Sequence, residues 1–179
     1  PIMYPSIDWR KYLLNKTSMQ TQHNLNISGG TKDIRYFISL GFLYQNGLLK
    51  QFEGVGYDNN YKYKRYNYRA NLDFDATKTT TLKIGIGGIV GNRNEPMIND
   101  ATNSIWTLIN QTTPFSSPGV IDGKLIVTPE ERFDNKINLG NSALPKCYGT
   151  GYSTAINNTM NLDLLLNQKL DFITKGLSA

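Results

Sequence analysis

Cysteine and histidine are nearly absent from this sequence of 179 residues, which contains one of each, Cys147 and His23. A single cysteine cannot form an internal disulfide bond, and the two residues do not supply the ligand spacing of a zinc site. No serine or cysteine nucleophile stands in a recognisable motif that would pair with His23. We therefore expect no metal and no cofactor, and we predict that the protein is not an enzyme.

Long apolar runs are also missing. No segment approaches the roughly 18 to 20 consecutive apolar residues of a membrane-spanning helix, so helical membrane spans are excluded. The first residues, Pro1 to Tyr4, lack the basic stretch and the apolar core of a signal peptide. If the chain meets a membrane, it does so by another kind of structure.

Concentrated positive charge is the third absence. The formal net charge is +5, but the basic residues are scattered among acidic ones. Because no recognition helix or RNA-binding strand motif accompanies them, we expect no nucleic-acid binding. The glycine-rich run from Gly85 to Gly91 is not followed by a helix that could present its N-terminus to a phosphate, so we interpret it as a thinned strand.

What the sequence does contain is long alternation of apolar and polar residues, most clearly between Arg65 and Asp75. Side chains alternate across a strand, so such a segment has one apolar face and one polar face. The apolar face carries Tyr66, Tyr68, Ala70, Leu72 and Phe74, and the polar face carries Arg65, Asn67, Arg69, Asn71 and Asp73.

The same pattern predicts five strands and the start of a sixth at 177–179. The five strands cover residues 23–29, 34–46, 65–76, 82–91 and 159–170. Short turns follow the first, third and fifth strands, and long segments follow the second and fourth. In the first turn Gly29 and Gly30 are free to adopt positive φ.

The longest connection has a predicted organisation of its own. Asn99 or Asp100 can cap a short helix that ends before Pro114, and a short strand is expected from Lys124 to Thr128. Three aromatic residues of this connection are candidates for stacking on a sugar or docking a partner, with a small core of the loop itself as the alternative. They are Trp106, Phe115 and Tyr148.

Two apolar media can accept the apolar strand faces, a protein core or a lipid bilayer. Soluble strands average about 5 to 6 residues, whereas a tilted strand needs about 9 to 11 residues to cross a membrane, and the predicted strands are long. Alternation of tight turns with long loops is typical of outer-membrane barrels. We therefore predict an all-β membrane protein, a portion of an antiparallel transmembrane β-barrel with long extracellular loops at 47–64 and 94–153. A soluble carbohydrate-binding β-sandwich is the alternative.

Several stretches resemble the SusC/RagA-type TonB-dependent outer-membrane transporters. They span most of the chain in the expected order. The matching stretches are Asp8-Trp9 with the helix after it, the block from His23 to Gly30, the strand from Arg35 to Gly47, the segment from Arg65 to Asp73, and the turn from Leu170 to Leu177.

The resemblance implies a barrel of about 22 strands around an internal plug. Residues 1–22 would be a short helical lead-in from plug to barrel, and residues 23–179 would be the first five strands and the start of the sixth. The chain would lie in the outer membrane of a Gram-negative bacterium, where it would import oligosaccharides or peptides with a SusD-like surface lipoprotein and draw energy from TonB through parts of the parent protein outside this sequence.

The resemblance also gives the two strand faces their roles. The apolar residues would face outer-membrane lipid, and the polar residues Arg65, Asn67, Arg69, Asn71 and Asp73 would contact the plug or the solute. The alternative for these polar residues is a mutually paired network on the barrel wall. A passive porin or adhesin barrel would share the same strands and is the other alternative function.

Overall fold

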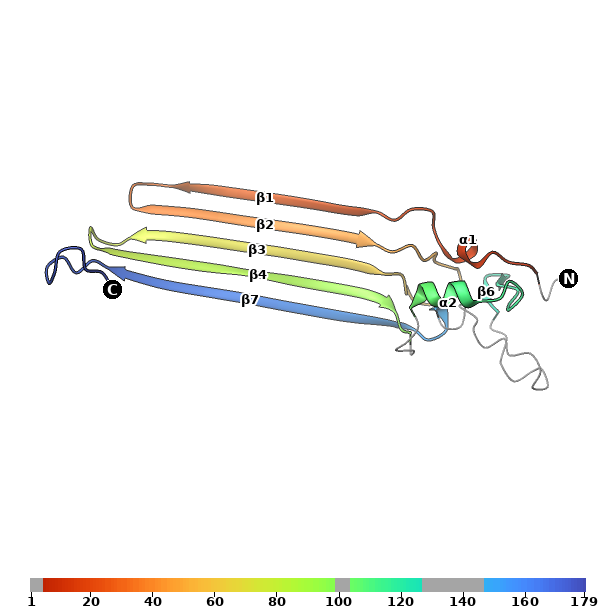
Figure 1. Ribbon diagram of the computed structural model, residues 1–179. Helices are drawn as coiled ribbons and strands as arrows, with labels where there is room; N and C mark the ends of the chain where they lie inside the picture. Colours follow the sequence, from red (N-terminus) through yellow and green to blue (C-terminus); the bar gives the residue numbers. More distant parts are fainter. Residues whose placement is uncertain (1–4, 99–103, 127–146) are drawn as a thin grey trace. The chain divides into compact units, whose positions relative to one another are not determined.

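The computed structural model describes residues 5–98, 104–126 and 147–179, which belong to two compact units (Figure 1). We call them the sheet unit, residues 20–44, 63–92 and 156–179, and the loop unit, residues 1–19, 45–62 and 93–155. The loop unit thus combines the segment before the first strand with both long connections.

The main sheet has five strands, and each strand is hydrogen-bonded to the next in chain order. The strands are β1 (Gln20–Gly30), β2 (Ile34–Asn46), β3 (Lys62–Asp75), β4 (Thr80–Pro96) and β7 (Tyr152–Gln168). Figure 1 shows neighbouring strands running in opposite directions, so the sheet is antiparallel. Most of the described chain is therefore β-structure, as the alternation predicts.

The observed strands match the alternating segments but extend beyond several of them. β2 has the predicted bounds, whereas β4 continues past Gly91 to Pro96 and β7 begins at Tyr152 rather than Thr159. The added residues are mainly polar on both faces, so alternation does not mark them. Side chains help to hold the extensions together, because the Thr154 hydroxyl lies 3.3 Å from Asn94 Oδ1.

In the first tight turn, Gly29 and Gly30 do not use their freedom to adopt positive φ. Both glycines end β1, and they are needed there for space. A Cβ on Gly29 would lie 2.5 Å from the Tyr36 hydroxyl, and one on Gly30 would collide with the Ile34 carbonyl oxygen. The turn itself is closed by the Thr31 N–H, which donates to the Ile34 carbonyl at 2.7 Å.

After the last turn the chain folds back against the end of β7. Gln168 and Ala179 exchange two backbone hydrogen bonds of 2.7 and 3.0 Å, and Lys169 pairs with Ser178 in an antiparallel bridge. Gly176, with φ of 84°, lets the chain reverse.

The loop unit contains two short helices and a small hairpin. Helix α1 (Trp9–Leu13) is capped by Asp8, and helix α2 (Ile105–Gln111) is capped by the Ser104 hydroxyl. The predicted caps Asn99 and Asp100 lie outside the described residues, and the described helix begins later than expected. None of the helices in the described ranges is long and apolar enough to cross a membrane.

The hairpin pairs β5 (Val120–Ile121) with β6 (Lys124–Leu125) through Asp122 and Gly123, which both have positive φ. It covers part of the short strand that the sequence predicts from Lys124 to Thr128, and Thr128 lies outside the described residues. A two-residue turn with positive φ at both positions matches the right-handed twist of a hairpin.

The hydrophobic core of the described chain lies in the loop unit. It consists of Trp9, Leu13, Leu49, Leu108, Ile109, Cys147 and Tyr148. Backbone hydrogen bonds join the first segment to both connections, because the Ile7 N–H donates to Pro114 and the Lys50 N–H donates to Leu13. The Trp9 indole N–H also donates to the Thr113 carbonyl at 2.8 Å. Residues 5–19 therefore pack as part of the long-loop structure.

Candidate functional site

The sheet unit has two faces of opposite character, as alternation requires. Two grooves lie on its polar face, and both are lined mainly by odd-numbered residues of β2, β3, β4 and β7. On β1 the even-numbered Asn24 shares this face, because a Cβ on Gly41 would lie 3.0 Å from its Oδ1 and 3.3 Å from Asn67 Nδ2. All five predicted polar residues of β3 line these grooves.

One groove contains an ion-pair network that crosses three strands. Arg35 of β2 lies 3.1 Å from Asp75 and 4.0 Å from Asp73 of β3, and Lys83 of β4 lies 3.9 Å from Asp73. Thr81 donates a hydrogen bond of 2.8 Å to the other oxygen of Asp75. Asp73 therefore belongs to a network of ion pairs on the polar face of the sheet unit, and Asn71 lines the same groove.

The other groove contains cations without acidic partners. Arg65, Asn67 and Arg69 line it, and neither arginine makes an ion pair with any residue in the described ranges. Arg65 Nε and Asn67 Oδ1 are buried without a hydrogen-bond partner there. Gly87 keeps the groove open on the β4 side, since a Cβ there would meet only the Tyr68 carbonyl, at 3.5 Å. The structure thus separates the predicted set into a paired group and an unpaired group.

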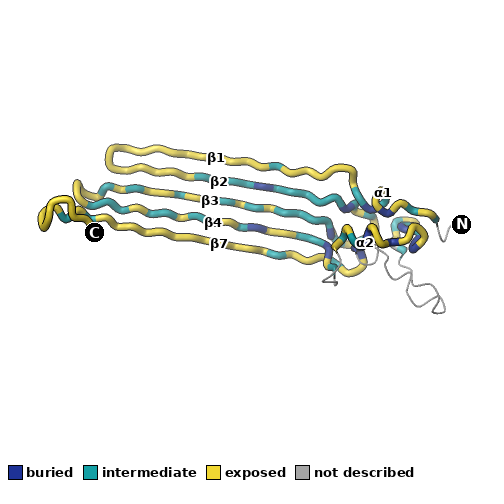
Figure 2. Tube along the Cα trace, in the orientation of Figure 1, coloured by how far each residue is buried: buried dark blue, intermediate teal, exposed yellow. Residues whose placement is uncertain are grey.

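Most residues of the five strands are exposed or of intermediate burial (Figure 2). Leu25, Leu40, Tyr66 and Leu72 are between 37% and 55% exposed, and Leu164 of β7 is 71% exposed. Every buried hydrophobic residue except Leu43 lies in the loop unit. The described residues place no second layer over the apolar face of the sheet unit.

Aromatic side chains mark both ends of the apolar face. His23, Phe42 and Tyr66 form a row across β1, β2 and β3, with ring centroids 6.5 and 5.0 Å apart. Tyr36 and Phe74 lie at the other ends of β2 and β3, near the tight turns. Aliphatic residues fill the band between the two aromatic rows. They include Ile38, Leu40, Ala70 and Leu72.

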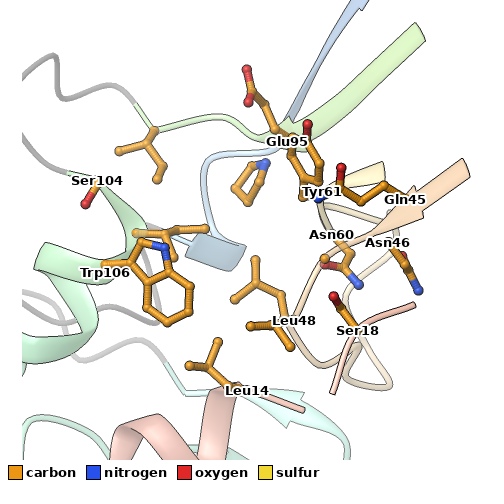
Figure 3. Close-up of a pocket in the computed structure, with 15 residues that line it drawn as sticks. Leu14, Ser18, Gln45, Asn46, Leu48, Asn60, Tyr61, Glu95, Ser104 and Trp106 are labelled. Carbon is orange, nitrogen blue, oxygen red and sulfur yellow. The ribbon is translucent and has the colours of Figure 1, made fainter. Parts of the chain in front are cut away.

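The loop unit contains a pocket of about 580 Å³. Figure 3 shows Trp106 of α2 on one side and the polar side chains of Gln45, Asn46 and Asn60 on the other. Leu14 and Leu48 lie between the two groups (Figure 3). Segments far apart in the sequence therefore build this pocket together, and it combines an aromatic ring with amides.

The three loop aromatics occupy different environments. Trp106 is 47% exposed and lines the pocket, whereas Phe115 is 51% exposed and does not line it. Tyr148 is only 2% exposed, packs in the core and donates a hydrogen bond of 2.8 Å to the Lys50 carbonyl. Tyr148 thus takes the alternative role expected of these residues, a small core of the loop itself.

The pocket amides Asn46 and Asn60 are not among the residues that the sequence singled out. Asn46 is the last residue of a predicted strand, and Asn60 lies in the polar stretch before the next strand. Only the packing of the loop unit brings them to one surface with Trp106. No local sequence signal distinguishes them from the other asparagines of the chain.

Burial controls the two titratable groups of the loop core. Desolvation raises the pKa of the Cys147 thiol to about 12, and it raises the pKa of the neighbouring Tyr148 hydroxyl as well. A thiol with so high a pKa is protonated at neutral pH and is a poor nucleophile. In the described ranges no group of three or more histidine, cysteine, aspartate or glutamate residues is placed to hold a metal ion.

Fold and site together define an antiparallel β-protein whose main sheet exposes an apolar face and carries charged grooves on the other. No protein-family model matches the sequence. The chain is similar to the TonB-dependent receptor SusC of Bacteroides thetaiotaomicron, with 27% identity over 125 residues. This match covers 62% of the chain and 12% of the receptor, so the chain spans a small part of the length of that relative.

Proposed function

We propose that this chain is a segment of the barrel wall of a TonB-dependent transporter in the outer membrane of a Gram-negative bacterium. The transporter imports oligosaccharides or peptides together with a SusD-like surface lipoprotein. The observation that carries this proposal is the apolar face of the five-stranded sheet, which is exposed, banded by aromatics and covered by no second layer of the described chain.

The dimensions of this face support contact with lipid. Its strands have 11 to 17 residues, and a tilted strand needs about 9 to 11 to cross the hydrocarbon layer. Tyr66 and Phe74 are eight positions apart in β3, about 27 Å along the strand. At a strand tilt of about 35 to 45° this length corresponds to about 20 Å along the membrane normal, which is close to the apolar band of about 25 Å between the two aromatic girdles of outer-membrane barrels.

The edges of the sheet support a continuing barrel. The outer edge of β1 has no neighbouring strand in the described part of the chain, and β7 is flanked by the start of another strand at Ser178. A bare strand edge in lipid costs several kcal/mol for each unsatisfied backbone group, so the parent protein must pair both edges. In a soluble β-sandwich a second sheet would cover the apolar face instead, and the only other described sheet is the short β5–β6 hairpin of the loop unit.

The position of the first segment changes one part of the prediction. Outer-membrane barrels have tight turns at the periplasmic end and long loops outside. Residues 5–19 pack with both long connections, through Leu14 paired with Leu49 and Ile7 bonded to Pro114. We therefore propose that residues 5–19 lie at the same end of the barrel as the long outer loops.

Import, energy coupling and the partner are supported by the similarity to a TonB-dependent receptor. The polar face would line the lumen, where the unpaired Arg65 and Arg69 are available to a plug or a solute and the Arg35 network stiffens the wall. No observation specifically supports the alternative of a passive porin or adhesin barrel.

The orientation of the faces is tested by the quenching of a fluorophore in lipid. Single cysteines at Leu72 and Leu40 of the full-length protein, with Cys147 replaced by serine, are labelled with an environment-sensitive dye in vesicles with brominated acyl chains. We expect strong quenching at both positions and little at Asn71 and Asn67, the matched controls on the opposite face. Equal quenching on both faces, or none on either, contradicts the proposal.

A further inference from the structure

The three tight turns of the sheet unit, residues 31–33, 76–79 and 169–178, form one row at the end of the sheet (Figure 1). The Asp75 N–H donates to the Asp33 carbonyl at 2.8 Å, which joins the first turn to the end of β3. The Lys169 N–H donates to the Thr79 carbonyl at 2.8 Å, which joins the second turn to the third. We call this surface the turn row.

The turn row carries an excess of positive charge. It contains four exposed lysines, and none of them makes an ion pair within the described ranges. They are Lys32, Lys78, Lys169 and Lys175. The acidic residues of the same turns are Asp33 and Asp171, and Asp171 already accepts a hydrogen bond of 2.7 Å from the Gly176 N–H. The adjacent ion-pair network contains two cations and two carboxylates, so it does not offset the lysines.

The lysines lie just beyond one of the two aromatic rows. Phe74 is followed at once by Asp75 and the second turn, and Tyr36 lies near the start of β2 after the first turn. When this aromatic row lies at a membrane interface, the turns lie at the level of the lipid headgroups. A lysine suits that level, because its flexible apolar stem carries a compact charge toward water.

We propose that the turn row binds the headgroups of anionic phospholipids in the periplasmic leaflet of the outer membrane. This inference rests on the proposed function, which places the apolar face in lipid and the tight turns at the periplasmic end. A negative membrane surface attracts each lysine close to it, whereas a zwitterionic headgroup carries a cation that offsets its phosphate. The turn row therefore selects lipids by their net charge.

The test compares two lipids around the full-length protein in vesicles. A dye on Phe74→Cys, with Cys147 replaced by serine, reports on lipid next to the turns through quenching by brominated acyl chains. Brominated phosphatidylglycerol mixed with plain phosphatidylcholine, and the reverse mixture, give the relative affinity of the two lipids. We expect phosphatidylglycerol to be preferred about 5-fold, the effect of one lysine near an anionic surface. The preference should be lost when Lys32, Lys78 and Lys175, one lysine from each turn, are all replaced by glutamine.

Two further variants separate charge from other effects. Arginine at the same three positions keeps the charge and should keep the preference. The matched control replaces three exposed lysines outside the turn row by glutamine, which removes the same charge from the protein. They are Lys16, Lys64 and Lys124. We expect this control to retain the preference, because salt screens exposed charges beyond about 10 Å.

Three results overturn the inference. They are equal affinity for the two lipids in the wild type, a preference that survives in the glutamine variant of the turns, and an equal loss of preference in the matched control. Quenching by brominated phosphatidylcholine alone reports whether lipid contacts the sheet at all. When that quenching is strong and the two lipids do not differ, only this inference fails, and when it is absent, the proposed function fails.

Discussion

At the scale of single residues, the polar face of the sheet separates charges that look alike in the sequence. Arg35, Arg65 and Arg69 all alternate with apolar neighbours, yet only Arg35 lies within reach of carboxylates. Its two partners, Asp73 and Asp75, lie on the same face of β3, and removing the arginine leaves Asp73 with Lys83 alone. Charge pairing on this face therefore depends on the sheet, because the pairing of the strands determines which charged side chains lie next to each other.

Replacing Arg35 with glutamine should lower the free energy of unfolding of the full-length protein slightly, since an exposed ion pair contributes little and this arginine is shared by two acids. Urea unfolding in detergent at low salt measures the change. Lys32→Gln, in an exposed turn and without an ion pair in the described chain, is the control and should leave the midpoint unchanged. An equal effect of both variants contradicts the network.

Cys147 should resist thiol reagents in the folded protein. With a pKa of about 12, roughly one thiol in 10⁴ is ionised at pH 8, and the side chain is fully buried. Mass spectrometry of the Cys147 peptide after iodoacetamide treatment should show labelling only once the protein is unfolded. A cysteine placed at exposed Phe115 should react under native conditions, and rapid native labelling of Cys147 would contradict the buried core.

The raised pKa values of Cys147 and Tyr148 also set the alkaline limit of the loop unit. Well below pH 9 both groups are protonated in the folded and the unfolded state, so their ionisation does not change stability there. Above pH 9 the unfolded thiol ionises while the folded one stays protonated, so stability falls as pH rises from about 9 toward 12. Thermal unfolding followed by the fluorescence of buried Trp9 should show this loss, and Cys147→Ala should reduce it.

At the scale of elements, a charged substitution should reduce stability more on the apolar face of a strand than on its polar face. A charge on the lipid face of a barrel at the bilayer midplane costs about 2 to 4 kcal/mol, whereas the polar face tolerates it. We therefore expect Leu72→Arg to destabilise the full-length protein in lipid vesicles by that amount and Asn71→Arg to change its stability little. An equal loss of stability in Leu72→Arg and Asn71→Arg would contradict the assignment of the faces.

The glycines of β4 also differ by face and neighbour. A Cβ on Gly88 would collide with the Thr159 carbonyl oxygen of β7 and lie 2.5 Å from the Tyr68 hydroxyl, whereas one on Gly87 would meet only the Tyr68 carbonyl oxygen at 3.5 Å. Overpacking of this kind costs typically 1 to 3 kcal/mol. Gly88→Ala should therefore destabilise the sheet by about that amount in urea unfolding, while its neighbour Gly87→Ala should be nearly neutral.

At the scale of the whole molecule, the sheet has two features that favour aggregation in water. Within the described residues its β1 edge is unpaired and its apolar face is exposed. Expressed alone, these 179 residues should elute as aggregates in size-exclusion chromatography without detergent. A monodisperse, folded monomer in plain buffer is the result that a soluble β-sandwich requires, and it would exclude the barrel.

Much of this architecture could be predicted from the sequence, because strand faces depend on local alternation. The period of two placed β2 correctly and located the other strands of the main sheet, and it separated the apolar residues from Arg65, Asn67, Arg69, Asn71 and Asp73. The strand ends could not be predicted where both faces are polar, as at Asn94 and Thr154. The close approach of Tyr36 to Gly29 could not be predicted, because Tyr36 lies on the next strand.

By itself, then, the sequence determined the type of each element and which side chains share a face, since both depend on neighbours along the chain. Only the tertiary structure decided which charges pair, that Tyr148 enters a core while Trp106 lines a pocket, and that residues 5–19 pack with the long connections. These outcomes depend on contacts between segments far apart in the sequence, and local periodicity carries no information about them.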